Sequence, residues 1–263
     1  MSLRRNSLAI LALGLLLHTP AANAATAIGK VVAVLGSPSA SGPGGDRKLS
    51  AGSPVYEHDK IKVGNGNAQI VLNDDTKLVV GPGSELQIES FLMRGGNTAQ
   101  KVSVNALRGT FRFITGKSKK SAYDVETASA TIGIRGTGFD FWVRGQTGLA
   151  LMQGHATLCA KQGGKKSAKC VNLDPTCELG RAGGTSATIV SRGNQGQFIY
   201  RNLPYIINQS PLRTQFHLPV STCSAYVNGP GGAGGQGNQG NPANTSRGVL
   251  GNDGGTCPNN PDC

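Results

Sequence analysis

Short stretches of alternating apolar and polar residues follow one another from Ile28 to Leu158, and this alternation constrains the fold more than any other feature of the chain. In one stretch, Ala68, Ile70 and Leu72 occupy every second position. Successive side chains of a β-strand point to opposite faces of a sheet, so each stretch has one apolar face and one polar face. Turn residues recur about every 8–12 residues, a spacing typical of all-β proteins. We therefore expect an all-β fold of many short strands, either β-solenoid-like or a two-sheet β-sandwich.

The N-terminus has the pattern of a secretory signal peptide. Arg4 and Arg5 precede an apolar run at residues 8–17, and Ala22-Asn23-Ala24 is a small-residue cleavage site. The run is shorter than the ~20 residues that a membrane-spanning helix needs. We expect cleavage after Ala24 and export to the periplasm or the medium, with a mature chain that does not span the membrane. A retained membrane anchor is the alternative.

All the cysteines lie in the C-terminal half of the chain: Cys159, Cys170, Cys177, Cys223, Cys257 and Cys263. An even number of cysteines in an exported chain favours disulfide bonds, because that compartment is oxidising. Cys159–Cys170 and Cys257–Cys263 are the locally plausible pairs, but the sequence leaves the connectivity open. Metal binding is the competing interpretation, and the chain has neither a C-x2-C pair nor histidines at zinc-finger spacing.

Composition divides the chain into four parts. Residues 1–24 are the signal peptide and residues 25–158 the β domain. Residues 159–227 form a cysteine-containing extension that packs on the domain, with short strands expected at 185–191 and 197–200. Residues 228–263 are rich in Gly, Asn and Pro and bury too little apolar surface to order themselves, so a disordered tail is expected. A small module held by cysteines is the alternative for this last part.

Five motifs in the β domain resemble, in order, those of the FecR domain, a bacterial periplasmic module. They lie at residues 52–64, 68–78, 109–113, 127–139 and 153–156. The residues that carry the resemblance are Asp59, Gly64, Leu72, Gly109, Gly136, Thr137, Phe139 and Gly154. The resemblance implies a solenoid-like or sandwich-like fold and a role in binding or signalling outside the cytoplasm.

The chain departs from the family pattern at a few positions. His58 and Asp75 stand where the family usually has Gly, Val63 replaces Thr, and Ala128 replaces Pro. The family's namesake regulators also carry a cytoplasmic anti-sigma domain and a transmembrane helix before the module. Here a cleavable signal precedes it, so control of a cytoplasmic sigma factor is not implied.

The chain is basic, with a formal net charge of +12, and the excess is concentrated in its middle. The candidate ligand-binding or polyanion-binding residues are Lys117, Lys119, Lys120, Arg135, Lys161, Lys165, Lys166 and Lys169. If the two lysine-rich loops lie at the same end of the fold, they form one cationic patch that attracts anionic polymers. A solvated surface without a binding role is the alternative, and for Arg135 the alternative is a part in a tight bend at Gly136. Nucleic acid is not an expected partner of an exported chain.

Catalytic groupings are absent from the sequence. His58, His155 and His217 fall in separate segments, and no G-x-S-x-G motif occurs. The pair Asp74-Asp75 has the position of a hairpin turn rather than of an acid–base pair. We therefore expect a non-enzymatic exported protein, without a cofactor, that binds a protein partner or ligand in the cell envelope. The alternative is a module that binds peptidoglycan, lipopolysaccharide or capsule through its basic loops.

Overall fold

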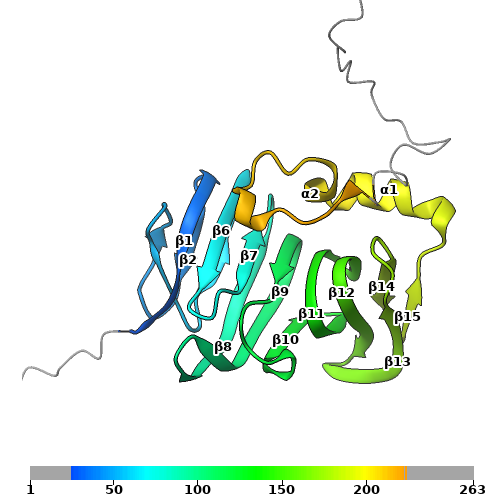
Figure 1. Ribbon diagram of the computed structural model, residues 1–263, viewed down its shortest axis with the longest axis horizontal. Coiled ribbons are helices and arrows are strands. Elements are labelled where there is room, and N and C mark those ends of the chain that lie inside the picture. The colour runs from blue at the N-terminus through cyan, green and yellow to red at the C-terminus, as the bar shows by residue number, and fades with distance from the viewer. Residues whose placement is uncertain (1–24, 222, 224–263) are drawn as a thin grey trace, which may run out of the picture. The chain divides into compact units, whose positions relative to one another are not determined.

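The computed structural model describes residues 25–221 and residue 223, and these form one mixed β-sheet with a short helical segment after it (Figure 1). The expected all-β fold is confirmed. The strands are β1 Ala27–Gly36, β2 Ser39–Ser41, β3 Arg47–Lys48, β4 Pro54–Tyr56, β5 Lys60–Lys62, β6 Gly66–Leu72, β7 Lys77–Val80, β8 Glu85–Gly95, β9 Thr98–Ile114, β10 Tyr123–Thr127, β11 Ala130–Arg144, β12 Gln146–Gln162, β13 Lys165–Leu173, β14 Leu179–Gly183 and β15 Ser186–Ile189. The helices are η1 Lys120–Ala122, α1 Arg192–Asn202, α2 Pro204–Ile207 and η2 Thr214–Phe216.

The three longest strands, β9, β11 and β12, change partners midway and thereby fold the sheet into two layers. The first half of β9 pairs with β8 and β10, and its second half pairs with β7 and β11. Likewise, β12 pairs with β14 through its first half and with β13 through its second half. The inner faces of the two layers enclose one apolar core. Of the two expected architectures, the structure therefore has the sandwich-like one, built from a single folded sheet.

A glycine with positive φ marks the bend in each of these strands, at Gly109, Gly136 and Gly154. At each bend the alternation of inward-facing residues changes phase. In β12, for example, the core residues before the bend have odd numbers (Leu149, Leu151), and those after it have even numbers (Ala156, Leu158). A Cβ atom on Gly154 would lie 2.1 Å from the carbonyl oxygen of Gly136, so the two bends pack backbone against backbone. These three family-motif glycines therefore set where the sheet folds over.

The segment after β15 covers the outer face of one layer, and we call it the strap (residues 190–221 and Cys223). Ile199 and Leu203 of the strap pack with Trp142 and Met152 of the sheet. The strand expected at residues 197–200 is wrong, because these residues belong to α1. Gln195, Ile199 and Leu203 are buried at a spacing of four, which places them on one face of a helix. The strand expected at residues 185–191 is confirmed as β15.

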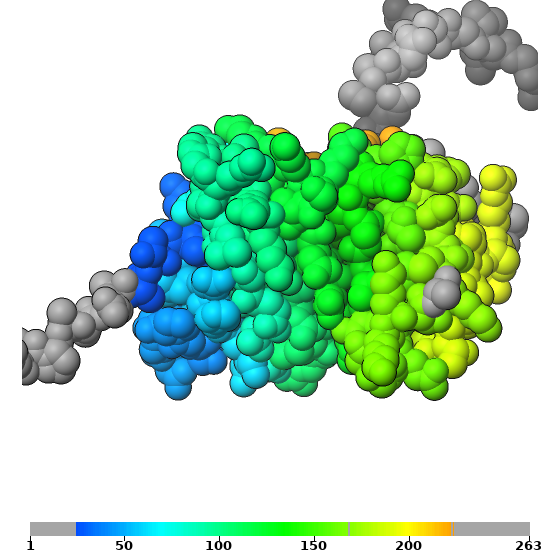
Figure 2. Space-filling view, turned by 90° about the horizontal axis from the view of Figure 1, so that it is seen from below, coloured from blue at the N-terminus to red at the C-terminus, as the bar shows by residue number. Residues whose placement is uncertain are grey.

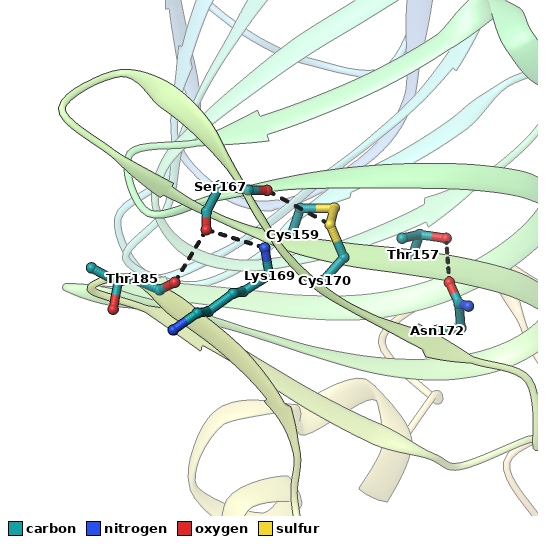
Figure 3. The surroundings of a disulfide bond; sticks show 7 residues. All are labelled: Thr157, Cys159, Ser167, Lys169, Cys170, Asn172 and Thr185. Atoms are coloured by element: carbon teal, nitrogen blue, oxygen red, sulfur yellow. Dashed lines mark hydrogen bonds between the residues drawn. A yellow bond between two sulfur atoms is a disulfide. The ribbon is translucent and has the colours of Figure 1, made fainter.

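Two disulfide bonds lie within the described residues. Cys159–Cys170, one of the two expected local pairs, joins β12 to β13 (Figure 3). Nearby, Ser167 donates to the carbonyl oxygen of Thr185 at 3.2 Å, which ties β13 to the turn before β15. Cys177–Cys223 was not expected from the sequence and closes the end of the strap onto the sheet. Cys257, Cys263 and the tail expected at residues 228–263 lie outside the described residues, as does the signal peptide expected at residues 1–24.

Strand β12 runs without a break through residue 158, where we expected the β domain to end, and β13 to β15 extend the same sheet. The extension is therefore continuous with the sheet in the described part of the chain. Within that part, no helix is long and apolar enough to cross a membrane.

Candidate functional site

The family-motif residues build the scaffold rather than line a site. Asp59 is fully buried, forms an ion pair with Arg47 and accepts a hydrogen bond from the backbone N–H of Tyr56 at 2.8 Å. Leu72 and Phe139 lie in the core, and Thr137 is buried beside the Gly136 bend. The carbonyl oxygen of Gly64 accepts a hydrogen bond from the N–H of Gly83.

Two departures from the family pattern have a backbone explanation. His58 has φ of 66° and Asp75 has φ of 67°, both in the left-handed region. Glycine occupies this region without steric cost, which accounts for its presence at these two positions in the family pattern. The structure keeps the same backbone conformation with other residues in place.

Asp74 is a structural turn residue. It is fully buried, and its Oδ2 accepts hydrogen bonds from Thr76 Oγ1 at 2.9 Å, Ser118 Oγ at 2.7 Å and Tyr123 OH at 3.1 Å. Its Oδ1 accepts the N–H of Thr76. With these acceptor positions occupied, the carboxylate fixes the loop before β10 rather than offering an acid–base group.

A groove lies on the outer face of the layer opposite the strap, and we call it the β10 groove. Figure 2 shows this face of the molecule, across which β8 to β13 lie. The groove has a volume of about 280 Å³. Its polar lining consists of Asp124 and Glu126 from β10, Thr131 from β11, Lys161 from β12 and Lys166 from β13. Gly133 forms part of its floor without a side chain.

Two carboxylates with different partners define the electrostatics of the groove. Glu126 Oε2 lies 2.5 Å from Lys161 Nζ and is thereby neutralised. Asp124 has no hydrogen bond or ion pair with any described residue. Burial raises the pKa of the Asp124 carboxyl and Glu126 raises it further, whereas Lys101, Lys161 and Lys166 lower it. The groove therefore contains one uncommitted carboxylate, by which we mean that Asp124 has no hydrogen-bond or ion-pair partner among the described residues. The buried Thr131 hydroxyl in the same groove also lacks a described hydrogen-bond partner.

The structure separates the two basic loops that the sequence singled out. Residues 117–120 lie just before β10, whereas the N–H of Lys161 donates to the carbonyl oxygen of Ser129, just after β10. The loops thus approach opposite ends of β10 and do not form one cationic patch. Lys117 is paired with Asp75 at 2.6 Å.

The remaining candidate cations are exposed. Lys119, Lys120, Arg135, Lys165, Lys166 and Lys169 form no ion pair within residues 25–221. Of the expected binding residues, only Lys161 and Lys166 line the β10 groove. Asp124, Glu126 and Thr131 were missed, although the alternation of Asp124 and Glu126 with buried Val125 places both carboxylates on one outward face.

The histidines do not assemble a catalytic centre in the described region. His155 Nδ1 lies 2.8 Å from Asp174 Oδ1, and both side chains are exposed. No described serine or cysteine contacts the other ring nitrogen of His155. His217 Nε2 lies 3.0 Å from the carbonyl oxygen of Leu212, within the strap. The described residues also contain no group of His, Cys, Asp and Glu able to hold a metal ion.

Comparison with known proteins agrees with the motif order. Residues 59–157 match the model of the family described as FecR protein, the same family that the five motifs resemble. No curated protein matches the chain.

Among solved structures, two crystal structures of a "putative anti-sigma factor" from Parabacteroides distasonis are similar to this chain. The first is 16% identical with a TM-score of 0.39, and the match covers 50% of this chain and 57% of that one. The second is 14% identical with a TM-score of 0.37, and the match covers 53% and 64% of the two chains. The match thus spans less than two thirds of either neighbour, and a likeness this weak defines neither a shared fold nor a shared function.

Proposed function

We propose that this chain is an exported FecR-domain protein that binds a protein partner or ligand in the bacterial cell envelope and transmits a signal by contact, without catalysis. The FecR domain at residues 59–157 supports a role in signalling. The folded, disulfide-bonded sheet supports a rigid recognition platform in an oxidising compartment.

The single observation that carries the proposal is the uncommitted Asp124 carboxylate in the β10 groove. A half-buried carboxylate without a partner costs free energy in the unbound protein, because it has lost part of its hydration without gaining a hydrogen bond. A ligand that donates from an ammonium or guanidinium group recovers this loss. Lys166, at the side of the same groove, lacks a described ion-pair partner and can meet an acidic group of that ligand. The groove therefore suits a dipolar segment, such as a peptide carrying both charges.

The test is capture followed by direct binding. The immobilised mature chain is expected to enrich one partner from an envelope extract, and the purified partner is then titrated by calorimetry. Asp124→Asn is expected to weaken binding at least about tenfold, the effect of losing a charged hydrogen bond. Asp46→Asn is the matched control, because Asp46 is exposed outside the groove and carries the same charge.

Two results would count against the proposal. Equal affinity of the wild type and Asp124→Asn would remove the groove as the binding site. Turnover of an envelope substrate by the purified chain, abolished by a single substitution, would replace the binding role with an enzymatic one.

Polyanion binding is a second candidate, favoured by one observation. Lys165, Lys166 and Lys169 are exposed on one strand of the β12–β13 hairpin, and no described acidic residue pairs with them. Binding to peptidoglycan, lipopolysaccharide or capsule through these lysines should weaken as salt rises and disappear when they become glutamate. Binding that survives both changes would eliminate this candidate.

A further inference from the structure

The hairpin between β8 and β9 carries two exposed apolar side chains in the last part of β8, before the turn at residues 96–97. Leu92 is 49% exposed and Met93 is 40% exposed, whereas the preceding Phe91 is buried and anchors the hairpin to the core. Single exposed apolar residues are common on protein surfaces and need no explanation. Here two adjacent large ones lie close to the turn of a hairpin, so their surroundings decide whether they have a role.

Those surroundings are mostly basic, with one acidic side chain from elsewhere in the chain, Glu57, whose Oε1 accepts a hydrogen bond from the N–H of Phe91 at 3.1 Å. Residues 90–122 include no Asp or Glu. Within this range, Arg112 is buried in an ion pair with Asp140, and Arg108 and Lys117 each pair with an acidic residue outside the range. Four exposed cations then have no described ion-pair partner: Arg94, Lys101, Lys119 and Lys120.

The fold brings the lysine loop against the hairpin. The N–H of Ala99 donates to Ser118 Oγ at 2.7 Å, and this bond is buried. Ala99 lies opposite Met93 in the strand register, and Lys101 lies opposite Leu92. The loop at residues 117–120 therefore lies at the same end of the sheet as the hairpin, on the β10 side of β9, with β9 between the loop and the two apolar side chains of β8. We call the hairpin at residues 92–101 and this loop together the basic tip.

We propose that the basic tip docks on an anionic lipid surface, with Leu92 and Met93 entering the headgroup layer and the four cations facing lipid phosphates. Short apolar wedges flanked by Lys and Arg partition into such interfaces, because burial of the apolar groups adds to electrostatic attraction. A hydrophilic polysaccharide would use the cations but not Leu92 and Met93, which is why a lipid surface fits better. Of the basic tip, only Lys101 lies close enough to lower the pKa of the Asp124 carboxyl, and Leu92, Met93, Lys119 and Lys120 do not line the β10 groove. Substitutions at these four residues therefore test the docking separately from the function proposed above.

The test is co-sedimentation of the mature chain with vesicles of phosphatidylcholine, with or without phosphatidylglycerol. Binding is expected only with phosphatidylglycerol, and it should fall as salt rises. Lys119→Gln/Lys120→Gln should weaken it about 25-fold, because each cation near an anionic membrane contributes a factor of about five. Leu92→Ser/Met93→Ser should weaken it about tenfold or more at every salt concentration. Both substituted pairs are exposed, and thermal unfolding checks that the variants fold.

Lys48→Gln/Lys62→Gln is the matched control, since it removes the same charge from exposed positions outside both the basic tip and the β12–β13 hairpin, and it should bind vesicles like the wild type. Equal binding by wild type and Leu92→Ser/Met93→Ser would overturn the proposal, leaving non-specific attraction of a basic protein. Absence of binding to anionic vesicles at low salt would overturn it as well. Binding to a soluble anionic polysaccharide that outcompetes the vesicles and is unaffected by Leu92→Ser/Met93→Ser would assign the tip to a polymer instead.

Discussion

Arg112 and Asp140 form a fully buried, two-pronged ion pair between neighbouring strands β9 and β11. Arg112 Nε lies 2.6 Å from Asp140 Oδ1, and Nη2 lies 2.8 Å from Oδ2. The guanidinium also donates to the carbonyl oxygens of Tyr205 and Phe216, at 3.1 and 3.0 Å, and to the side chain of Gln209. The pair therefore joins the sheet to the strap that covers it.

Breaking this ion pair should destabilise the protein strongly. Asp140→Ala leaves the Arg112 charge buried without its carboxylate, which is expected to lower the free energy of unfolding by about 3–5 kcal/mol. Urea unfolding measures the change, and limited proteolysis should show earlier cleavage within the strap. Lys117→Ala is the control, because the exposed pair of Lys117 with Asp75 is worth about 1 kcal/mol or less. Equal stability of the two variants would contradict this role for Arg112–Asp140.

Alanine at Gly154 should be far more costly than alanine at Gly163. Both glycines have positive φ, so both substitutions incur about 1–2 kcal/mol of backbone strain. Only at Gly154 would the added Cβ meet a backbone atom, the carbonyl oxygen of Gly136, whereas Gly163 has open space. We expect Gly154→Ala to lose at least about 2 kcal/mol more than Gly163→Ala in chemical denaturation. Similar losses would show that the bend at Gly154 relaxes freely.

Loss of the Cys177–Cys223 disulfide should destabilise the chain more than loss of Cys159–Cys170. The two bonds close loops with sequence separations of 46 and 11 residues. Because each disulfide restricts the unfolded chain, we expect its loss to lower the free energy of unfolding by about 4 kcal/mol for the longer loop and about 3 kcal/mol for the shorter one. Paired Cys→Ser variants, compared by urea unfolding, give the two values. The reverse order would indicate that native contacts of the hairpin outweigh the loop-closure effect.

Asp124 should make stability fall as the pH rises. Burial raises its pKa in the folded protein above the value of 3.8 in the unfolded chain, so the folded state binds the proton more tightly. As the pH rises above 3.8, Asp124 ionises in the unfolded chain before it does so in the folded protein, and this lowers the free energy of unfolding. The loss is complete once the pH exceeds the pKa in the folded protein. Asp124→Asn should remove the penalty and raise the melting temperature at neutral pH. If Asp124→Asn melted at a lower temperature than Asp46→Asn at neutral pH, the prediction would be wrong.

The alternation of side chains predicted the strands well, because period two is a local property of the extended chain. It did not predict what covers the outward face. In Phe111-Arg112-Phe113 the central arginine has the position of an exposed residue, and its burial depends on a segment about a hundred residues later. The same limit explains the error at residues 197–200. Phe198 and Tyr200 alternate as in a strand, but Ile199 and Leu203 are drawn into a helix by contact with Trp142 and Met152.

For the candidate site, too, the sequence predicted some residues but not how they are paired. Lys161 and Lys166 were named from the local concentration of charge, whereas Asp124 and Glu126 were missed, although their alternation with Val125 places both on one outward face. The sequence does not say that Lys161 is neutralised by Glu126 while Asp124 stays uncommitted, because that depends on register between β10, β11 and β12.

The sequence by itself determined the strand-rich fold and the FecR-like motifs with their bend glycines, and it offered Cys159–Cys170 as a local pair without fixing the connectivity. Each of these features depends on residues close together in the sequence, so backbone geometry and side-chain spacing are sufficient to predict it. Only the tertiary structure decided that the sheet folds on itself, that the strap closes over Arg112 and Asp140, and that the two basic loops lie at opposite ends of β10. These features depend on contacts between residues far apart in the chain. The burial that stabilises such contacts cannot be predicted from a local sequence pattern.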